Sequence, residues 1–260
     1  LAKKDFQVQL WSAGQTATAK AKLELLAARA TQLRTDAGQQ PKQIWTEFAE
    51  FSCFSCHQKI LPDPVAESIT KGSPVWSRWH LTFAAQLEGN APSLRESLEK
   101  LSRQRLIVNP NEVISLSQSA RGLLSGNSSQ EPLDRQQLLQ QVLVSLKSPE
   151  SDWETRSQQY LALVAAVRAE QDELAKGEFL SQLPLAEHQQ RQAEVKQRAE
   201  ELNRLGEFLR FQRPPRGVRL EEVVLIDEPV KFRDNRQQLG PALLKVAEQL
   251  AEQNHVRMKP

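Results

Sequence analysis

The chain has 260 residues, of which 39% are hydrophobic and 25% are charged, so it is long enough for one large domain or two small ones. Its 34 Lys and Arg residues nearly balance its 32 Asp and Glu residues, and no long run of one sign concentrates the charge. This balance removes any electrostatic argument for nucleic-acid binding. No run of about twenty apolar residues is present, so the sequence predicts no membrane span.

Three helical patterns are predicted in residues 1–90. The first covers residues 16–33, where Ala and Leu recur at intervals of three and four residues. The second begins with Pro41 in its first turn and carries an aromatic stripe from Trp45 to Phe54, which leads into the two cysteines. The third begins near Val75, and we expect it to place these residues on one face: Trp76, His80, Phe83, Ala84 and Leu87.

Helical patterns also dominate the middle of the chain. Residues 93–146 show three short helical patterns, which are separated by polar segments and proline. Ser151 and Asp152 form a capping signal before a strong pattern that runs to Leu174. Another long helix is predicted over residues 185–211.

The end of the chain is less regular. Residues 218–226 are rich in β-branched side chains and are expected to be extended, and a last helix is predicted over residues 239–253. The sequence shows no internal repeat, no sustained heptad and no series of strands. The predicted fold class is therefore all-α, as an irregular multi-helix bundle.

One short motif carries the chemistry of this sequence. Cys53-Phe54-Ser55-Cys56-His57 has the C-x-x-C-H spacing in which two thiols form thioethers with haem and the adjacent histidine ligates its iron. A zinc site would need a second pair of ligands, and the other three histidines are scattered over the chain. A thioredoxin-like site would need βαβ surroundings, whereas this motif ends a predicted helix. The sequence therefore predicts one covalently attached haem c, held by Cys53, Cys56 and His57.

The second axial ligand of the iron stays open. His80 is the first candidate because it shares the expected apolar face of the third helix, and the alternative is a core or boundary histidine bonded to a carbonyl. Met258, the only methionine, would give a centre of higher potential, but it lies in a polar tail. His188 and His255 have polar neighbours and are expected to be solvated surface residues.

Aromatic residues gather on both sides of the motif. Trp76, Trp79 and Phe83 are expected to line the haem pocket; aromatic stripes at helical spacing usually mark a core, and here the haem would be part of that core. We expect the chain to divide into a haem-binding helical region over residues 1–90, a helical packing or docking region over 91–215, and an extended segment with the C-terminal helix over 216–260. The alternative is one continuous domain.

The region around the motif resembles a known family. Residues 45–57 are similar to the W-x-x-F-x-x-Y-x-C-Y-x-C-H-H-D-L segment of large bacterial multihaem c-type cytochromes. The Ala- and Leu-rich helix before the motif, residues 76–79, residues 152–163 and residues 229–232 resemble further segments of that family in the same order.

The sequence departs from this family in two ways. Gln58 stands where the family usually has a second histidine, and the further upstream C-x-x-C-H motifs of the family are missing here. The resemblance therefore implies the carboxy-terminal, one-haem portion of such a cytochrome, which would relay electrons beside other cytochrome or redox chains in a hetero- or homo-oligomer.

The location and two other classes of function complete the expectations. Haem attachment of this kind occurs mainly outside the cytoplasm, so we expect an exported, periplasmic chain; because no leader pattern precedes the first helix, we expect a processed chain or part of a longer one. An electron carrier is favoured over an enzyme. The alternatives are a haem enzyme or ligand-binding protein with an open distal site for peroxide or nitrogen oxides, and a structural subunit of a haem complex.

Overall fold

The computed structural model describes most of the helices and the turns next to them. The described residues are 4–36, 42–45, 76–77, 79–84, 92–104, 107–126, 132–147, 151–176, 184–210 and 230–256. They are mainly helical, with a single two-stranded pairing among them, so the predicted all-α class is confirmed.

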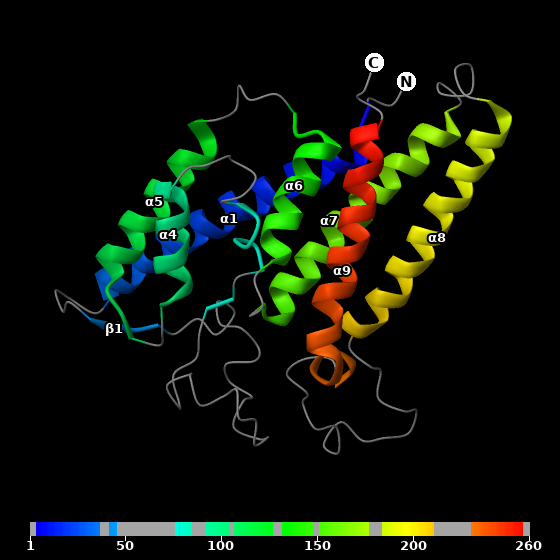
Figure 1. Cartoon of the computed structure of the whole chain (residues 1–260). Coiled ribbons are helices and arrows are strands. Elements are labelled where there is room, and N and C mark those ends of the chain that lie inside the picture. The colour runs from blue at the N-terminus through cyan, green and yellow to red at the C-terminus, as the bar shows by residue number, and fades with distance from the viewer. Residues whose placement is uncertain are drawn as a thin grey trace, which may run out of the picture. The chain divides into compact units, whose positions relative to one another are not determined.

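The helices and strands are numbered along the chain, and Figure 1 labels most of them. Their bounds are α1 Phe6–Asp36, β1 Gln43–Ile44, α4 Pro92–Ser102, β2 Ile107–Val108, α5 Pro110–Gly126, α6 Arg135–Leu146, α7 Trp153–Ala175, α8 Leu185–Leu209 and α9 Val230–Val256. The three short patterns predicted over residues 93–146 are α4, α5 and α6. The two long patterns that follow are α7 and α8.

Local side-chain chemistry explains where two of these helices begin. The Asp152 carboxylate accepts a hydrogen bond from the Thr155 N–H at 2.7 Å, which satisfies one of the free donors in the first turn of α7. At the start of α6, the Asp134 carboxylate accepts from the Gln137 N–H at 2.7 Å, and the Gln137 side chain accepts from the Asp134 N–H at 3.1 Å. Both caps are encoded by residues within one turn.

The chain folds into two compact units, and α1 supplies residues to both of them. One unit comprises residues 1–14, 131–213 and 228–260, and the other comprises residues 15–130 and 214–227. Helix α1 continues from one unit into the other.

The first unit contains helices α6, α7, α8 and α9 together with the first residues of α1 (Figure 1). Helix α7 packs against α6, α8 and α9, and α9 also packs against α6 and α8. The hydrogen bond from Gln159 to Ser145 at 2.8 Å and the ion pair of Arg135 with Glu173 at 2.8 Å show that α6 and α7 run antiparallel. Helix α9 consists of two segments joined at Asn235, where the backbone is not helical.

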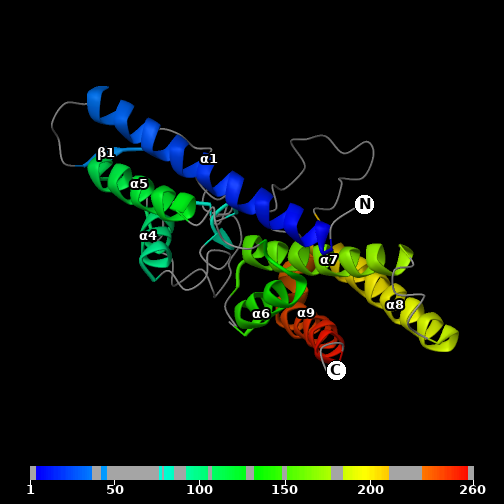
Figure 2. The same cartoon turned by 90° about the horizontal axis from the view of Figure 1, so that it is seen from above.

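The second unit has its core between α1, α4 and α5. In Figure 2, α1 and α5 lie side by side, and α4 packs against α5. Ala and Leu residues of α1 at three- and four-residue spacing face this core, as the periodicity predicts. The short strands β1 and β2 pair antiparallel, with Ile44 opposite Ile107. The core residues are Ala19, Leu23, Leu26, Ala30, Trp45, Trp76, Leu81, Ala84, Leu94, Leu98, Leu101, Val108, Val113, Ala120 and Leu124.

Two predicted helices are wrong where the structure describes them. Residues 43–44 form strand β1 instead of the first turns of a helix, and residues 79–83 form turns, with helix only at Ala84. At residues 43–44 a contact distant in sequence replaces the helix, because β1 pairs with β2. The extended segment expected over residues 218–226 lies outside the described residues.

Candidate functional site

The C-x-x-C-H motif lies between two described tryptophans. Cys53, Cys56 and His57 fall in residues 46–75, which are outside the described residues. Trp45 immediately precedes this segment and Trp76 immediately follows it. The structure therefore describes the two ends of the segment that carries the motif.

These two ends meet in the core of the second unit. The ring centroids of Trp45 and Trp76 lie 4.7 Å apart with an angle of 50° between the ring planes, and the residues are 1% and 3% exposed. A tilted arrangement at this distance is a favourable geometry for two aromatic rings. This buried contact holds the two ends of the segment that carries the motif close together.

Both indoles bury an N–H group that has no hydrogen-bond acceptor among the described residues. The atoms are Nε1 of Trp45 and Nε1 of Trp76. A buried tryptophan N–H usually finds an acceptor, because leaving it unsatisfied costs about 1 to 3 kcal/mol. Two such donors on adjacent rings fit a bound group that carries carboxylates, and haem carries two propionates.

His80 lies four residues after Trp76, on the turn formed by residues 79–83. Its side chain is exposed, so it does not share the buried face of Trp76 that the sequence predicted; a helix would have placed it there, and the turn does not. Partial desolvation, followed by the positive charge of Lys22 on α1, lowers the pKa of His80. The imidazole is therefore neutral at pH 7, and neutral imidazole is the form that ligates a metal.

The predicted pocket residues differ in exposure. Trp76 and Phe83 are buried at 3% and 0% exposure, whereas Trp79 is half-buried. The backbone N–H of Trp79 donates to Ser77 Oγ at 3.3 Å. Trp76 and Phe83 are thus buried core residues, and Trp76 belongs to the core cluster of the second unit.

The other histidines and the methionine fall outside this region. Met258 and the side chain of His255 are outside the described residues. The prediction that His188 is a solvated surface residue is wrong: it is 5% exposed in α8, in the unit of helices α6 to α9. His188 precedes Val195, Leu202 and Leu209 at seven-residue intervals, and this register, which the sequence contains, puts it on the buried side of α8.

Two buried ion-pair clusters in the first unit were not predicted from the sequence. Arg135 lies 3.8 Å from Asp5 Oδ1 and 2.8 Å from Glu173 Oε2. Glu170 contacts Arg198 at 3.1 Å and Arg191 at 3.7 Å. These residues are spread over three helices and the residue before α1, so local sequence patterns carry no signal for them.

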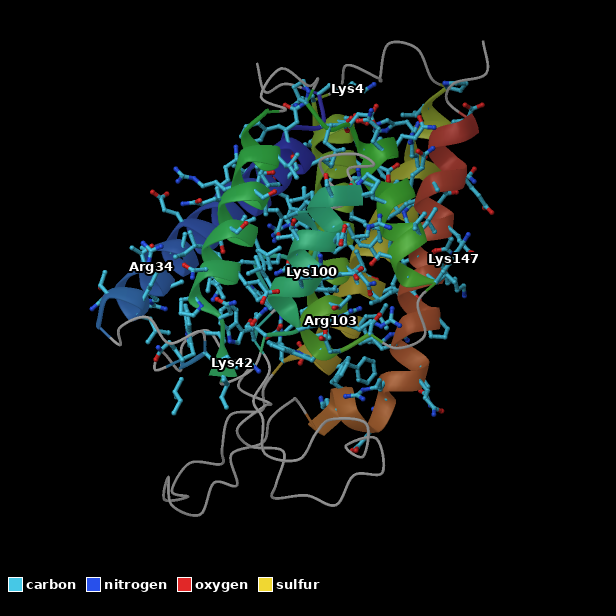
Figure 3. All side chains as sticks on the ribbon, turned by 90° about the vertical axis from the view of Figure 1, so that its left-hand side faces the viewer. Lys4, Arg34, Lys42, Lys100, Arg103 and Lys147 are labelled. Atoms are coloured by element: carbon cyan, nitrogen blue, oxygen red, sulfur yellow. The ribbon has the colours of Figure 1, made fainter. Side chains whose placement is uncertain are left out.

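Surface charge at the end of α4 is compensated within the helix. Lys100 and Arg103, both labelled in Figure 3, pair with Glu96 at 2.8 Å and with Glu99 at 3.5 Å, one turn earlier. The hydrogen bond between Lys100 and Glu96 raises the pKa of Lys100 and lowers the pKa of Glu96. These two cations therefore add no local excess of positive charge.

Comparisons with known proteins give no relatives. No protein-family model matches the chain, and no curated protein or solved structure matches it. Within the described part of the chain, no helix is both long and apolar enough to cross a bilayer, and no three His, Cys, Asp or Glu residues lie together as metal ligands would.

Proposed function

We propose that this chain is a c-type cytochrome that relays electrons through one haem, attached at Cys53 and Cys56 with His57 as an axial ligand. The observation that carries the proposal is the C-x-x-C-H spacing of the only two cysteines in the chain. The buried indoles that flank the motif support it, because they offer donors to a group with carboxylates. When bound, the haem supplies one-electron redox chemistry.

His80 is the proposed second axial ligand. It follows Trp76 closely in the chain, its imidazole is exposed, and its lowered pKa keeps it neutral at pH 7. Trp76, Trp79 and Phe83 are the proposed aromatic wall of the site. An exported, periplasmic location and an assembly with other haem-bearing or redox chains, as in the multihaem cytochromes that the motif region resembles, belong to the same proposal.

The test is to express the chain with an export signal and a c-type maturation system. The expected product carries the mass of one haem and a low-spin absorption spectrum that does not respond to carbon monoxide. The matched control is the double variant Cys53→Ala/Cys56→Ala, which should carry no haem. A colourless wild-type chain whose two thiols titrate as free would refute the proposal.

One observation favours a haem enzyme or ligand-binding protein as the second candidate. His80 lies on an exposed turn instead of in the core, so its side chain is not held in place by surrounding apolar packing. Without His80 on the iron, the distal position is open to peroxide or a nitrogen oxide. A high-spin spectrum that changes with carbon monoxide would favour this candidate.

The variant His80→Gln separates the two assignments. Loss of the low-spin spectrum in His80→Gln, with retention in the control His255→Gln, is the result expected for His80 as the axial ligand. An unchanged low-spin spectrum in His80→Gln would eliminate that ligand.

A further inference from the structure

We propose that the indole N–H groups of Trp45 and Trp76 form a two-donor site for the propionates of the haem. This inference rests on the proposed function and deepens it, because it names residues that would hold the carboxylates of the cofactor. Its observation is independent of the motif: two buried donors on adjacent rings have no acceptor among the described residues.

The surroundings of the two indoles are apolar, so an acceptor that binds there depends on the two N–H groups as its donors. Both residues belong to an apolar cluster with Leu23, Leu26 and Leu81, where an ionised carboxylate is costly unless donors meet it. Hydrogen bonds to a carboxylate are roughly twice as strong as bonds between neutral groups. A single carboxylate offers about four lone-pair sites on its two oxygens, so it accommodates both donors.

The two tryptophans also lie close in sequence to the residues that are proposed to hold the haem. Trp45 precedes Cys53 by eight residues, and Trp76 precedes the proposed axial ligand His80 by four.

The proposed roles of the two tryptophans are to position the haem, since they would contact its carboxylates and not its iron. The rival interpretation is structural: the N–H groups bond to backbone carbonyls of residues 46–75, and the tryptophans only close the segment. The two interpretations differ in whether removing an N–H changes the vibrations of the propionates.

Infrared difference spectra of the haem-bearing chain test this. The haem is labelled with ¹³C at its propionate carboxyls through labelled 5-aminolevulinic acid, so that the carboxylate bands in the reduced-minus-oxidised spectrum are identified by their isotope shift. Trp45→Phe and Trp76→Phe keep the aromatic ring and remove the donor. Each is expected to shift a labelled band.

The control is Trp153→Phe, in which the lost donor bonds to the Leu209 carbonyl at 3.0 Å in the other unit. Its labelled bands should match those of the wild type. Unchanged bands in both Trp45→Phe and Trp76→Phe overturn the inference, and a shift in only one of them overturns the two-donor site. A chain that carries no haem at all would instead refute the proposed function.

A second measurement applies if the variants lose haem. The indole ¹⁵N–¹H resonances of the five tryptophans are compared in the wild-type chain before haem attachment and in the reduced, haem-bearing form. The resonances of Trp45 and Trp76, assigned with the two variants in the haem-free state, are expected to move downfield and exchange more slowly after attachment. Resonances of Trp45 and Trp76 that stay in place overturn the inference.

Discussion

At the residue scale, two helical glycines have opposite surroundings. A Cβ at Gly206 in α8 would lie 2.5 Å from Oη and 2.8 Å from Cζ of Tyr160 in α7, whereas a Cβ at Gly122 in α5 has no heavy atom within 4 Å. The Tyr160 ring thus occupies the space that any larger residue at position 206 would need, and the close packing of α7 on α8 depends on this glycine.

Gly206→Ala is expected to lower the free energy of unfolding by about 1 to 3 kcal/mol, because the Tyr160 ring must leave its place. Gly122→Ala is the control and is expected to raise it by about 0.5 to 1 kcal/mol, because alanine favours a helix. Chemical denaturation of both variants measures the difference. Equal stability of the two variants would contradict the packing described for Tyr160.

Tyr160 also predicts a pH dependence. Burial of the phenol raises its pKa, against the opposing effect of Arg210 and Arg168. Since the folded state holds the proton more tightly than the unfolded state, the contribution of Tyr160 is complete below pH about 10 and is lost as the pH rises further. Tyr160→Phe should flatten the decline of stability above pH 10 relative to the wild type; parallel declines would show that the phenol does not contribute.

At the scale of elements, Asp152 is the cap on which the start of α7 depends. Asp152→Ala is expected to lower the free energy of unfolding by about 1 kcal/mol, because the Thr155 N–H loses its acceptor. Asp152→Asn keeps an oxygen at the cap and should stay close to the wild type. A loss of equal size in both variants would point to the charge of Asp152 instead of its hydrogen bond.

Helices α7 and α8 are also joined by a buried ion-pair cluster. The Glu170 side chain is 3% exposed and contacts Arg198 and Arg191. Glu170→Gln removes the buried carboxylate that both arginines contact, so we expect the free energy of unfolding to fall by about 3 to 5 kcal/mol. Glu207→Gln is the matched control, because its 2.6 Å pair with Arg210 is more than half exposed and is worth about 0 to 1 kcal/mol.

The elements that the sequence predicted correctly are those whose causes are local. Asp152 and the helical period that follows it lie within one segment, and the structure confirms α7 where they predict it. Residues 43–44 were predicted as helix because aromatic residues recur at helical spacing, but a strand pairing with residues 107–108 decides their conformation. Contacts between positions so far apart leave no local pattern.

The same distinction holds for the candidate site. The motif is local and was recognised from its spacing alone, and attachment of haem to it stays a prediction. The burial of His188 was predictable from its seven-residue register in α8. The unsatisfied indole donors of Trp45 and Trp76 were not, because burial and the lack of an acceptor are properties of the folded core.

At the scale of the whole molecule, the described contacts of the candidate site belong to one of the two units. Trp45, Trp76 and His80 all lie within residues 15–130. If the haem binds as proposed, its attachment should slow amide hydrogen exchange at residues 42–45 and 76–84, since bound groups stabilise the parts that hold them. Hydrogen-exchange mass spectrometry of the wild type against Cys53→Ala/Cys56→Ala measures this, and identical exchange in both would contradict the placement of the site.

The meeting of Trp45 and Trp76 has a consequence for how this protein can vary. Thirty residues separate the two tryptophans, and the entropy of joining the ends of such a span grows only with the logarithm of its length, by about 0.6 kcal/mol for each doubling. Insertions or deletions between Trp45 and Trp76 therefore change the entropy cost of closing this loop very little. The tryptophan pair is therefore a position where we expect a segment of another length to be accepted without loss of the Trp45–Trp76 contact.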